Sequence, residues 1–426
     1  MKIEIFKTQP RYDSVNNRSL KIQTYGEMND IPQRIMEIVS ASVTGSSCLD
    51  TYRKFVIGRG FNNEDFSKTV INLRGDTVAT LHRQVSEDYT EFGGFAIHVN
   101  YNALGEICSL CHVPFENIRF EMLDENYEFS RVAVHPDWGK RFQRLKRFRQ
   151  QDIEFFPLFN PDKNIIEKEV RSAGGWLAYK GQIYYYSNAG EKVYPMPKYA
   201  ASLTDMTNEE GLSNITHRNV KHNFLPAGML IDRNNKSNSD DQEDEARQEL
   251  SEYQGDMNAG KLMYVNLQAG EEPPEFKPFE VANTDKDFTD AEDKTPDIIG
   301  RSFCQPPILR AQDVGSNFGS DLMRNAYDFY NAQTETERMV IEDCFRMLFG
   351  LWYEPINEDN DFAILPKTYR VNQTVAEKLG ANTDKVVELL FDSTKTEASK
   401  RAVLDTIYGM DDDDITKLME GLRNAY

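Results

Sequence analysis

Cysteine and histidine occur at a chemically meaningful spacing in one place, where Cys108, Cys111 and His112 form a Cys-x-x-Cys-His pattern. This pattern is typical of covalent haem attachment. It lies inside an alternating sequence that predicts a strand, and residues three apart in a strand point to opposite faces. No second Cys/His pair at zinc-binding spacing lies nearby in the sequence. We therefore interpret the three as ordinary strand residues, with a haem protein as the alternative.

The sequence contains none of the common catalytic or nucleotide-binding signatures. Walker A, Gly-x-Gly-x-x-Gly, His-Glu-x-x-His and Gly-x-Ser-x-Gly patterns are all missing. The six histidines are dispersed, and the acidic clusters lack the Asp-x-Asp-x-Asp-Gly spacing of a calcium loop. We predict a protein that is not an enzyme and has no catalytic, cofactor or metal site. The alternative is a cytoplasmic enzyme whose site is assembled from scattered residues.

Cysteine content and hydropathy indicate in which cellular compartment the protein resides. The five cysteines are an odd number and widely spaced: Cys48, Cys108, Cys111, Cys304 and Cys344. The N-terminal residues alternate like a strand and lack the apolar stretch of a signal peptide. No apolar run approaches the roughly 20 residues of a membrane span. We expect reduced thiols in a soluble protein that stays where it is made.

Charge separates the chain from ordinary DNA-binding proteins. It has 69 acidic and 49 basic residues among 426, a formal charge of −20. Proteins that grip duplex phosphates have the opposite balance. One basic run, residues 140–149, carries six positive charges and could bind nucleic acid or an acidic partner, although an exposed face that offsets the surrounding acid is favoured.

Acidic residues crowd a polar loop over 232–245. Its carboxylates at Asp240, Asp241, Glu243, Asp244 and Glu245 would repel phosphate and offer complementary charge to a basic protein surface. We predict that they dock a partner, with a merely solvated loop as the alternative.

Periodicity predicts mixed α and β structure in the first half of the chain. One helix is predicted from Ile31 until Gly58 and Gly60 stop it, and a second over 78–92 ends at Gly93. The expected antiparallel strand pairs are 95–101 with 106–113, 118–122 with 129–134, and 182–186 with 192–194.

The second half is predicted to be mainly helical. Apolar residues recur at helical spacing over 199–220 and, most strongly, over 317–349, while 261–267 alternates as a strand. Three short helical patterns follow in the tail. Pro306 and Pro307 cannot extend a preceding helix, because proline lacks the amide donor and clashes with the previous turn. A loop between Phe303 and Asn317 is therefore expected.

Several pieces of the sequence, taken in order, resemble one family. They are residues 42–48 with 57–61, 92–99, 105–107, 113–119, 194–199, 223–230, 253–255, 258–261 and 298–309. In this order, over about residues 30–350, they resemble the portal (head-to-tail connector) proteins of tailed double-stranded DNA bacteriophages.

This resemblance implies an α+β portal fold with an α/β wing, a helical stem, a small α/β clip and a helical crown. The implied parts are the wing 1–195, stem helix 196–223, clip 224–283, second stem helix 284–303, channel loop 304–317, long helix and return to the wing 318–371, and crown 372–426.

The resemblance also implies a function. Portal proteins form rings, usually of twelve subunits, at one capsid vertex of the virion, after assembly in the host cytoplasm. They contact the major capsid protein, pass double-stranded DNA during packaging and ejection, and dock the terminase large subunit and then a tail or head-completion adaptor. The alternative in this class is another phage or prophage vertex or adaptor protein.

A channel needs weak contact with DNA, because every tight phosphate contact slows translocation. We predict that Arg301, Gln305, Arg310 and Gln312 line it, with Arg310 and Gln312 nearest the duplex. The alternative is an ordinary interhelical loop that buries Ile308, Leu309 and Val314 within one subunit.

Overall fold

The protein is described by a computed structural model. The described residues are 14, 16–122, 130–136, 138, 153–189, 193–221, 228–231, 275–278, 284–310, 320–369, 383–392, 395–406, 415–416 and 419. The basic run 140–149, the acidic residues 240–245, Gln312 and the predicted strand 261–267 lie outside them. The chain divides into two compact units, Met1–Lys367 and Thr368–Tyr426. The expected mixed α+β class is confirmed, and no helix among the described residues is long and apolar enough to cross a membrane.

A three-stranded antiparallel sheet forms the centre of the first unit. Strand β3 (Gly94–Tyr101) lies between β4 (Ile107–Val113) and β8 (Gln182–Ser187). The predicted hairpin of β3 and β4 is confirmed. The prediction that 182–186 pairs with 192–194 was wrong, because the described residues Val193 and Tyr194 form a bend and not a strand, and β8 pairs with β3 instead. Burial explains this choice: Phe95, Ile97 and Val99 are fully buried, so the second edge of β3 must also be covered.

A second three-stranded sheet contains β5 (Ile118–Phe120), β6 (Arg131–Val134) and β7 (Glu154–Pro157) in antiparallel order. The predicted pairing of 118–122 with 129–134 is confirmed. Strand β7 and the following helix α5 (Lys163–Ala173), which Asp162 caps, were not predicted. A short ribbon of β1 (Asn16–Asn17) and β2 (Ile22–Gln23) lies against β5.

The predicted helix that starts at Ile31 is broken in two. Helix α1 (Ile31–Ala41) ends at Ser42, and α2 (Val43–Ile57) begins directly after it. Ser42 has an extended backbone, and its Oγ accepts a hydrogen bond from the Gly45 amide, so it acts as an N-cap in mid-sequence. After the short α3 (Glu64–Lys68), α4 (Val78–Phe92) ends at a left-handed Gly93, as predicted.

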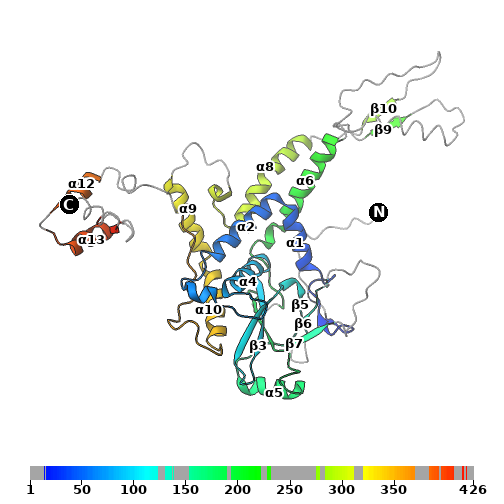
Figure 1. Cartoon of the computed structure of the whole chain (residues 1–426). Coiled ribbons are helices and arrows are strands. Elements are labelled where there is room, and N and C mark those ends of the chain that lie inside the picture. Colours follow the sequence, from blue (N-terminus) through cyan, green and yellow to red (C-terminus); the bar gives the residue numbers. More distant parts are fainter. Residues whose placement is uncertain are drawn as a thin grey trace, which may run out of the picture. The chain divides into compact units, whose positions relative to one another are not determined.

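Two neighbouring helices leave and re-enter this unit (Figure 1). A 3₁₀ turn, η4 (Ala200–Ser202), leads into α6 (Leu203–Lys221), which confirms the helix predicted over 199–220 and packs against α8 (Thr284–Ser302). Ser202 Oγ lies 2.8 Å from Ser302 Oγ, so the start of α6 meets the end of α8 and the helices are antiparallel. Between them in the chain, β9 (Gly228–Ile231) and β10 (Glu275–Pro278) pair antiparallel.

A carboxylate on α6 fixes this helix to the body. Glu209 accepts hydrogen bonds from Ser42 Oγ, the Thr44 amide and Thr44 Oγ1, the last at 2.6 Å. All three donors belong to the first turn of α2, where backbone amides lack helical partners and negative charge is favoured. The break at Ser42 therefore creates the anchor for α6.

The helix predicted over 317–349 is also interrupted. Helices α9 (Ser320–Gln333) and α10 (Glu335–Phe349) meet at Thr334. The buried Arg338 lies at this junction, where it donates to the Asn331 carbonyl at 2.7 Å, to Thr334 Oγ1 at 2.8 Å and to the Phe55 carbonyl of α2 at 3.0 Å. The bend thus provides acceptors for a buried guanidinium.

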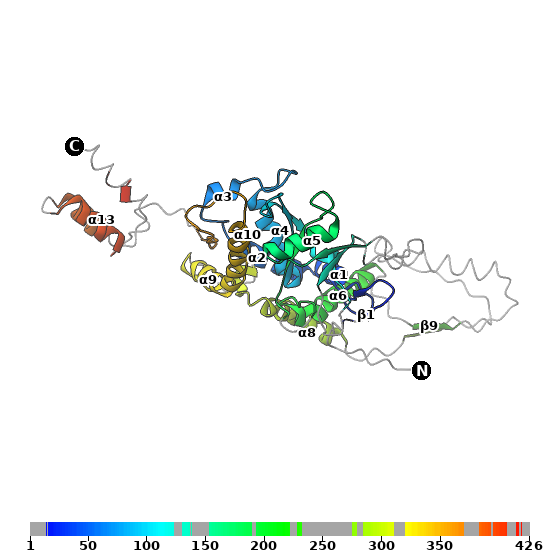
Figure 2. The same ribbon diagram turned by 90° about the horizontal axis from the view of Figure 1, so that it is seen from below.

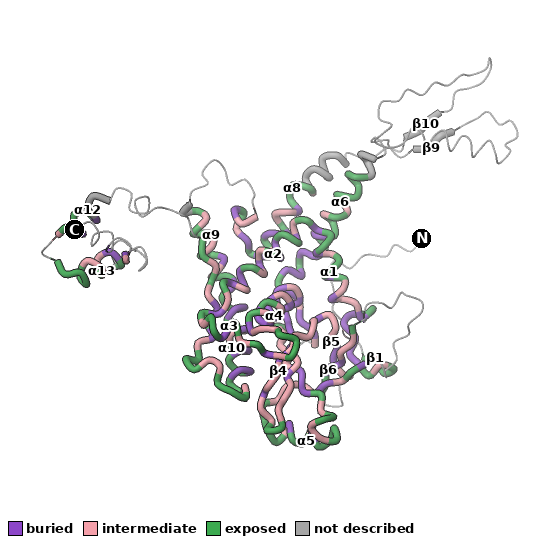
Figure 3. Tube along the Cα trace, in the orientation of Figure 1, coloured by how far each residue is buried: buried purple, intermediate pink, exposed green. Residues whose placement is uncertain are grey.

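The core of the first unit lies where α2, α4, β3 and α10 converge, and Figure 3 shows the buried residues concentrated there. The second unit has its own small core between α12 (Thr383–Phe391) and α13 (Glu397–Thr406). Its buried residues are Val386, Leu389, Leu390, Leu404, Ile415 and Met419. Two of the three short helices predicted in the tail are thereby confirmed, and the third begins at Asp411, outside the described residues.

Candidate functional site

The residues predicted to line a channel gather where α8 ends. The helix stops at Ser302, before Pro306 and Pro307, as the proline pair predicts. The next residues form a 3₁₀ turn, η6 (Pro307–Arg310), so the first part of the predicted loop is ordered. Arg301 is exposed, Gln305 is buried, and Arg310 turns back onto α8.

Arg310 is held within its own subunit. Its side chain is 7% exposed, and Nη1 donates to the Pro296 carbonyl at 3.1 Å and to Asp297 Oδ1 at 3.3 Å. The guanidinium lies against Gly300, where an added Cβ would be 2.1 Å from Nη1, so glycine is required for this approach. Ile308 is 5% exposed, and Leu309 packs against the core. An ordinary interhelical loop, the alternative interpretation, would bury these two residues in this way.

Gln305 is a buried link between three elements. Its Nε2 donates to the Cys48 carbonyl of α2 at 2.5 Å and to Tyr330 Oη of α9 at 3.2 Å. Tyr330 in turn donates to the Phe303 carbonyl at 3.1 Å. In this arrangement Gln305 fixes the end of α8 to the body, and Arg301 is the exposed cation of the predicted set.

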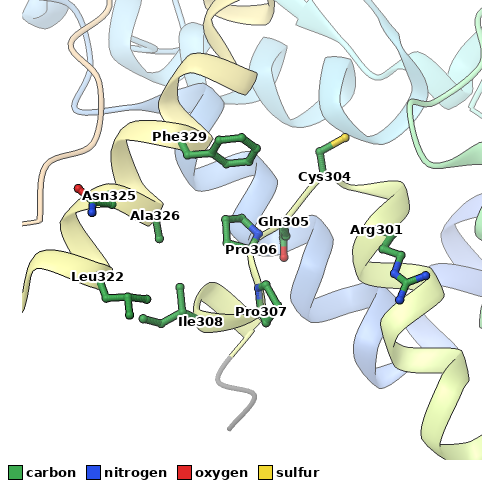
Figure 4. A pocket seen from close by; sticks show the side chains of 10 residues that line it. All are labelled: Arg301, Cys304, Gln305, Pro306, Pro307, Ile308, Leu322, Asn325, Ala326 and Phe329. Atoms are coloured by element: carbon green, nitrogen blue, oxygen red, sulfur yellow. The ribbon is translucent and has the colours of Figure 1, made fainter. Parts of the chain in front are cut away.

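An open groove of about 540 Å³ lies beside these residues (Figure 4). Pro306, Pro307 and Ile308 line it from the η6 side. From α9 it is lined by one helical face, Leu322, Asn325, Ala326 and Phe329. Arg301 and Cys304 complete its border. Leu322 belongs to the predicted apolar helical stripe, and its exposure was not predicted. The signal was the width of the stripe, which exceeds what one core contact can cover.

The Cys-x-x-Cys-His residues lie on strand β4, as predicted. Cys108 and Cys111 are half-buried free thiols, and burial raises the pKa of Cys108, which disfavours a reactive thiolate. His112 Nε2 lies 2.7 Å from Asp88 Oδ2, and the same carboxylate oxygen accepts the Phe115 amide at 3.0 Å. The imidazole thus links β4 to α4. Within the described ranges, no cluster of His, Cys, Asp and Glu could hold a metal ion.

The buried Asp88 predicts a pH dependence of stability. Burial raises its pKa from 3.8 to about 6, so between these values the folded chain holds a proton that the unfolded chain releases. Stability must therefore fall as the pH rises through this window. Asp88→Asn should remove up to about 1.4 kcal/mol per pH unit from the slope of unfolding free energy there. Urea unfolding from pH 4 to 7 measures it; the exposed Asp50→Asn is the control, and equal slopes for both variants would contradict the prediction.

Several solved structures align with this chain over most of its length. A subunit from the neck of a native gene transfer agent (GTA) particle, computed with C12 symmetry, has a TM-score of 0.43 at 14% identity, over 88% of this chain and 93% of that chain. A chain of the virion of a native GTA particle has a TM-score of 0.40 at 12% identity, over 94% and 96%. An HK97-family phage portal protein from Corynebacterium diphtheriae has a TM-score of 0.39 at 12% identity, over 82% and 93%.

The chain is structurally similar to portal and neck subunits over most of its length. Neither a protein-family model nor a curated protein matches its sequence.

Proposed function

We propose that this chain is the portal subunit of a phage or gene transfer agent particle, and that it forms a closed ring without catalytic activity. The observation that carries the proposal is the order of its parts. An α/β body leads into α6, the β9–β10 pair and the antiparallel α8, and then returns through α9 and α10. The family pieces of the sequence occur in the same order.

In this proposal α6 and α8 are the stem, β9 and β10 belong to the clip, and the C-terminal unit is the crown. Twelve copies around an axis would match the C12 symmetry of the similar neck particle. A helix pair that leaves the body and returns suits a tube built from one pair per subunit. The ring would lie at a capsid vertex, against the major capsid protein.

Charge supports a conduit that does not grip DNA. Each subunit carries a formal charge of −20, so a ring of copies surrounds the duplex with like charge and repels it from the wall. Of the predicted channel residues that the structure describes, Arg301 is the exposed one, because Gln305 and Arg310 are engaged within the subunit.

The ring is tested by native mass spectrometry of the purified full chain, followed by class-averaged electron micrographs. We expect one closed oligomer with a central opening. A monodisperse monomer at high protein concentration in physiological salt would overturn the proposal. A non-ring assembly would favour a different vertex or adaptor protein.

The acidic residues 240–245 are proposed to dock the terminase large subunit or the adaptor. Changing Asp240, Asp241, Glu243, Asp244 and Glu245 to their amides should weaken partner binding and reduce its salt dependence, because complementary charge is lost. Binding to either purified partner, measured between low and physiological salt, is the test. The matched control changes Asp411, Asp412, Asp413 and Asp414 to Asn. Unchanged binding by the clip variant would leave this segment a solvated loop.

A further inference from the structure

The groove between η6 and α9 has the chemistry of a protein interface. Leu322 is 42% exposed and Phe329 is 51% exposed, although both lie on one face of α9 and line a concave surface (Figure 4). Arg301, at the border, makes no ion pair with another described residue. Exposed apolar side chains gathered in a groove favour burial by another protein. A segment that brings an apolar side chain with a carboxylate beside it would satisfy both features.

Such a combination occurs on another side of the same unit. Around α1, Met28 is 46% exposed and Met36 is 39% exposed, and the acidic Glu27 and Glu37 are exposed next to them. Glu27 and Met28 lie just before α1, and Met36 and Glu37 lie on it; we refer to the surface that carries these four residues as the α1 face. The two ribbon views place α1 and α9 on opposite sides of α2 (Figures 1 and 2).

We propose that the groove binds the α1 face of a second copy of this chain. The inference rests on the proposed ring, and it assigns surfaces to that ring. Ring closure joins unlike faces of successive copies, so each copy must present two complementary surfaces in different directions. The methionines would fill the groove against Leu322 and Phe329, and Glu27 and Glu37 would supply the missing charge for Arg301.

A native thiol provides a direct test. Cys304 is exposed at the groove, whereas Cys48 and Cys344 are buried. In the assembled full chain, Met36→Cys treated with a short bismaleimide should give covalent dimers and higher multimers. Adding Cys304→Ser should abolish them. Leu177→Cys, at a side chain that is fully exposed outside the α1 face, is the matched control and should give no more multimers than the unmodified chain.

A second variant tests the groove itself. Phe329→Glu should convert rings to folded monomers, as judged by native mass and circular dichroism, whereas Met339→Glu on α10, at a side chain that is 54% exposed, should still assemble. Normal rings with Phe329→Glu, or equal cross-linking through Met36→Cys and Leu177→Cys, would overturn this inference and leave the ring intact. Absence of any ring from the unmodified chain would instead overturn the proposed function, and this inference with it.

Discussion

Arg310→Glu should lower the free energy of unfolding by about 2–4 kcal/mol, because breaking a buried charged contact leaves groups unpaired. The new carboxylate would face Asp297 and the Pro296 carbonyl, two acceptors that now share the Arg310 guanidinium. The end of α8 would lose its link to η6. Urea unfolding of the full chain measures the loss, and reduced ring yield should accompany it.

Arg301→Glu is the matched control for this change. It makes the same charge reversal on an exposed residue nine positions away, and we expect a stability change within about 0.5 kcal/mol. In the proposed ring the new carboxylate would face Glu27 and Glu37 of the next copy, so Arg301→Glu should reduce ring yield without this loss of stability. Equal stability of the two variants would show that the buried contacts of Arg310 contribute little.

Local chemistry was sufficient to predict several elements. The helix α4 combines a clear apolar stripe with a glycine stop at Gly93, and the β3–β4 hairpin has alternation together with a turn sequence. These signals act between residues close in the chain. Helix α8 likewise ends before Pro306 and Pro307, as predicted, although Pro296 is accommodated inside the same helix.

The two helix breaks could not be predicted in this way. Ser42 and Thr334 both lie inside continuous helical patterns, and each break is stabilised by hydrogen bonds that involve an element far away in the sequence. Glu209 of α6 binds the turn that begins at Ser42, and Arg338 joins the Thr334 junction to the Phe55 carbonyl. The strand pairing of β8 failed for the same reason, since it is decided by the need to cover β3.

For the predicted channel residues, too, local sequence signals were informative and long-range contacts were not predicted. Residue type predicted that Arg301, Gln305 and Arg310 line a channel. The structure places Arg301 in the last turn of α8 and the other two just after that helix, and their place in a channel stays a prediction. Residue type could not reveal that Gln305 and Arg310 donate hydrogen bonds to groups of their own subunit. It also could not reveal the groove, because the exposure of Leu322 and Phe329 depends on how α9 leaves the core.

Arg119 should be the residue of the β5–β6–β7 sheet that least tolerates substitution. Its side chain is fully buried, and burial lowers its pKa to about 10. The guanidinium lies between the rings of Tyr25 and Trp138, with its carbon 5.6 and 5.4 Å from their centroids. It donates to Asn29 Oδ1 at 2.6 Å, to the Asn29 carbonyl at 2.9 Å and to the Glu116 and Ile118 carbonyls. No carboxylate of the described residues pairs with it, so the charge is stabilised by dipoles and aromatic faces.

Arg119→Leu should therefore cost about 3–5 kcal/mol, since it leaves several buried carbonyl oxygens without donors. Arg119→Lys should lower the free energy of unfolding by less than Arg119→Leu does, because one ammonium can donate to some, but not all, of the acceptors of the planar guanidinium. Arg131→Leu, which removes a half-exposed arginine paired with Glu121 on the same sheet, should cost at most about 1 kcal/mol. Asn29 has a left-handed backbone directly before α1, so losing its contacts should also displace the α1 face and reduce ring yield. Urea unfolding and native mass of the three variants test both effects, and an Arg119→Leu chain as stable as Arg131→Leu would show that the acceptors find other donors.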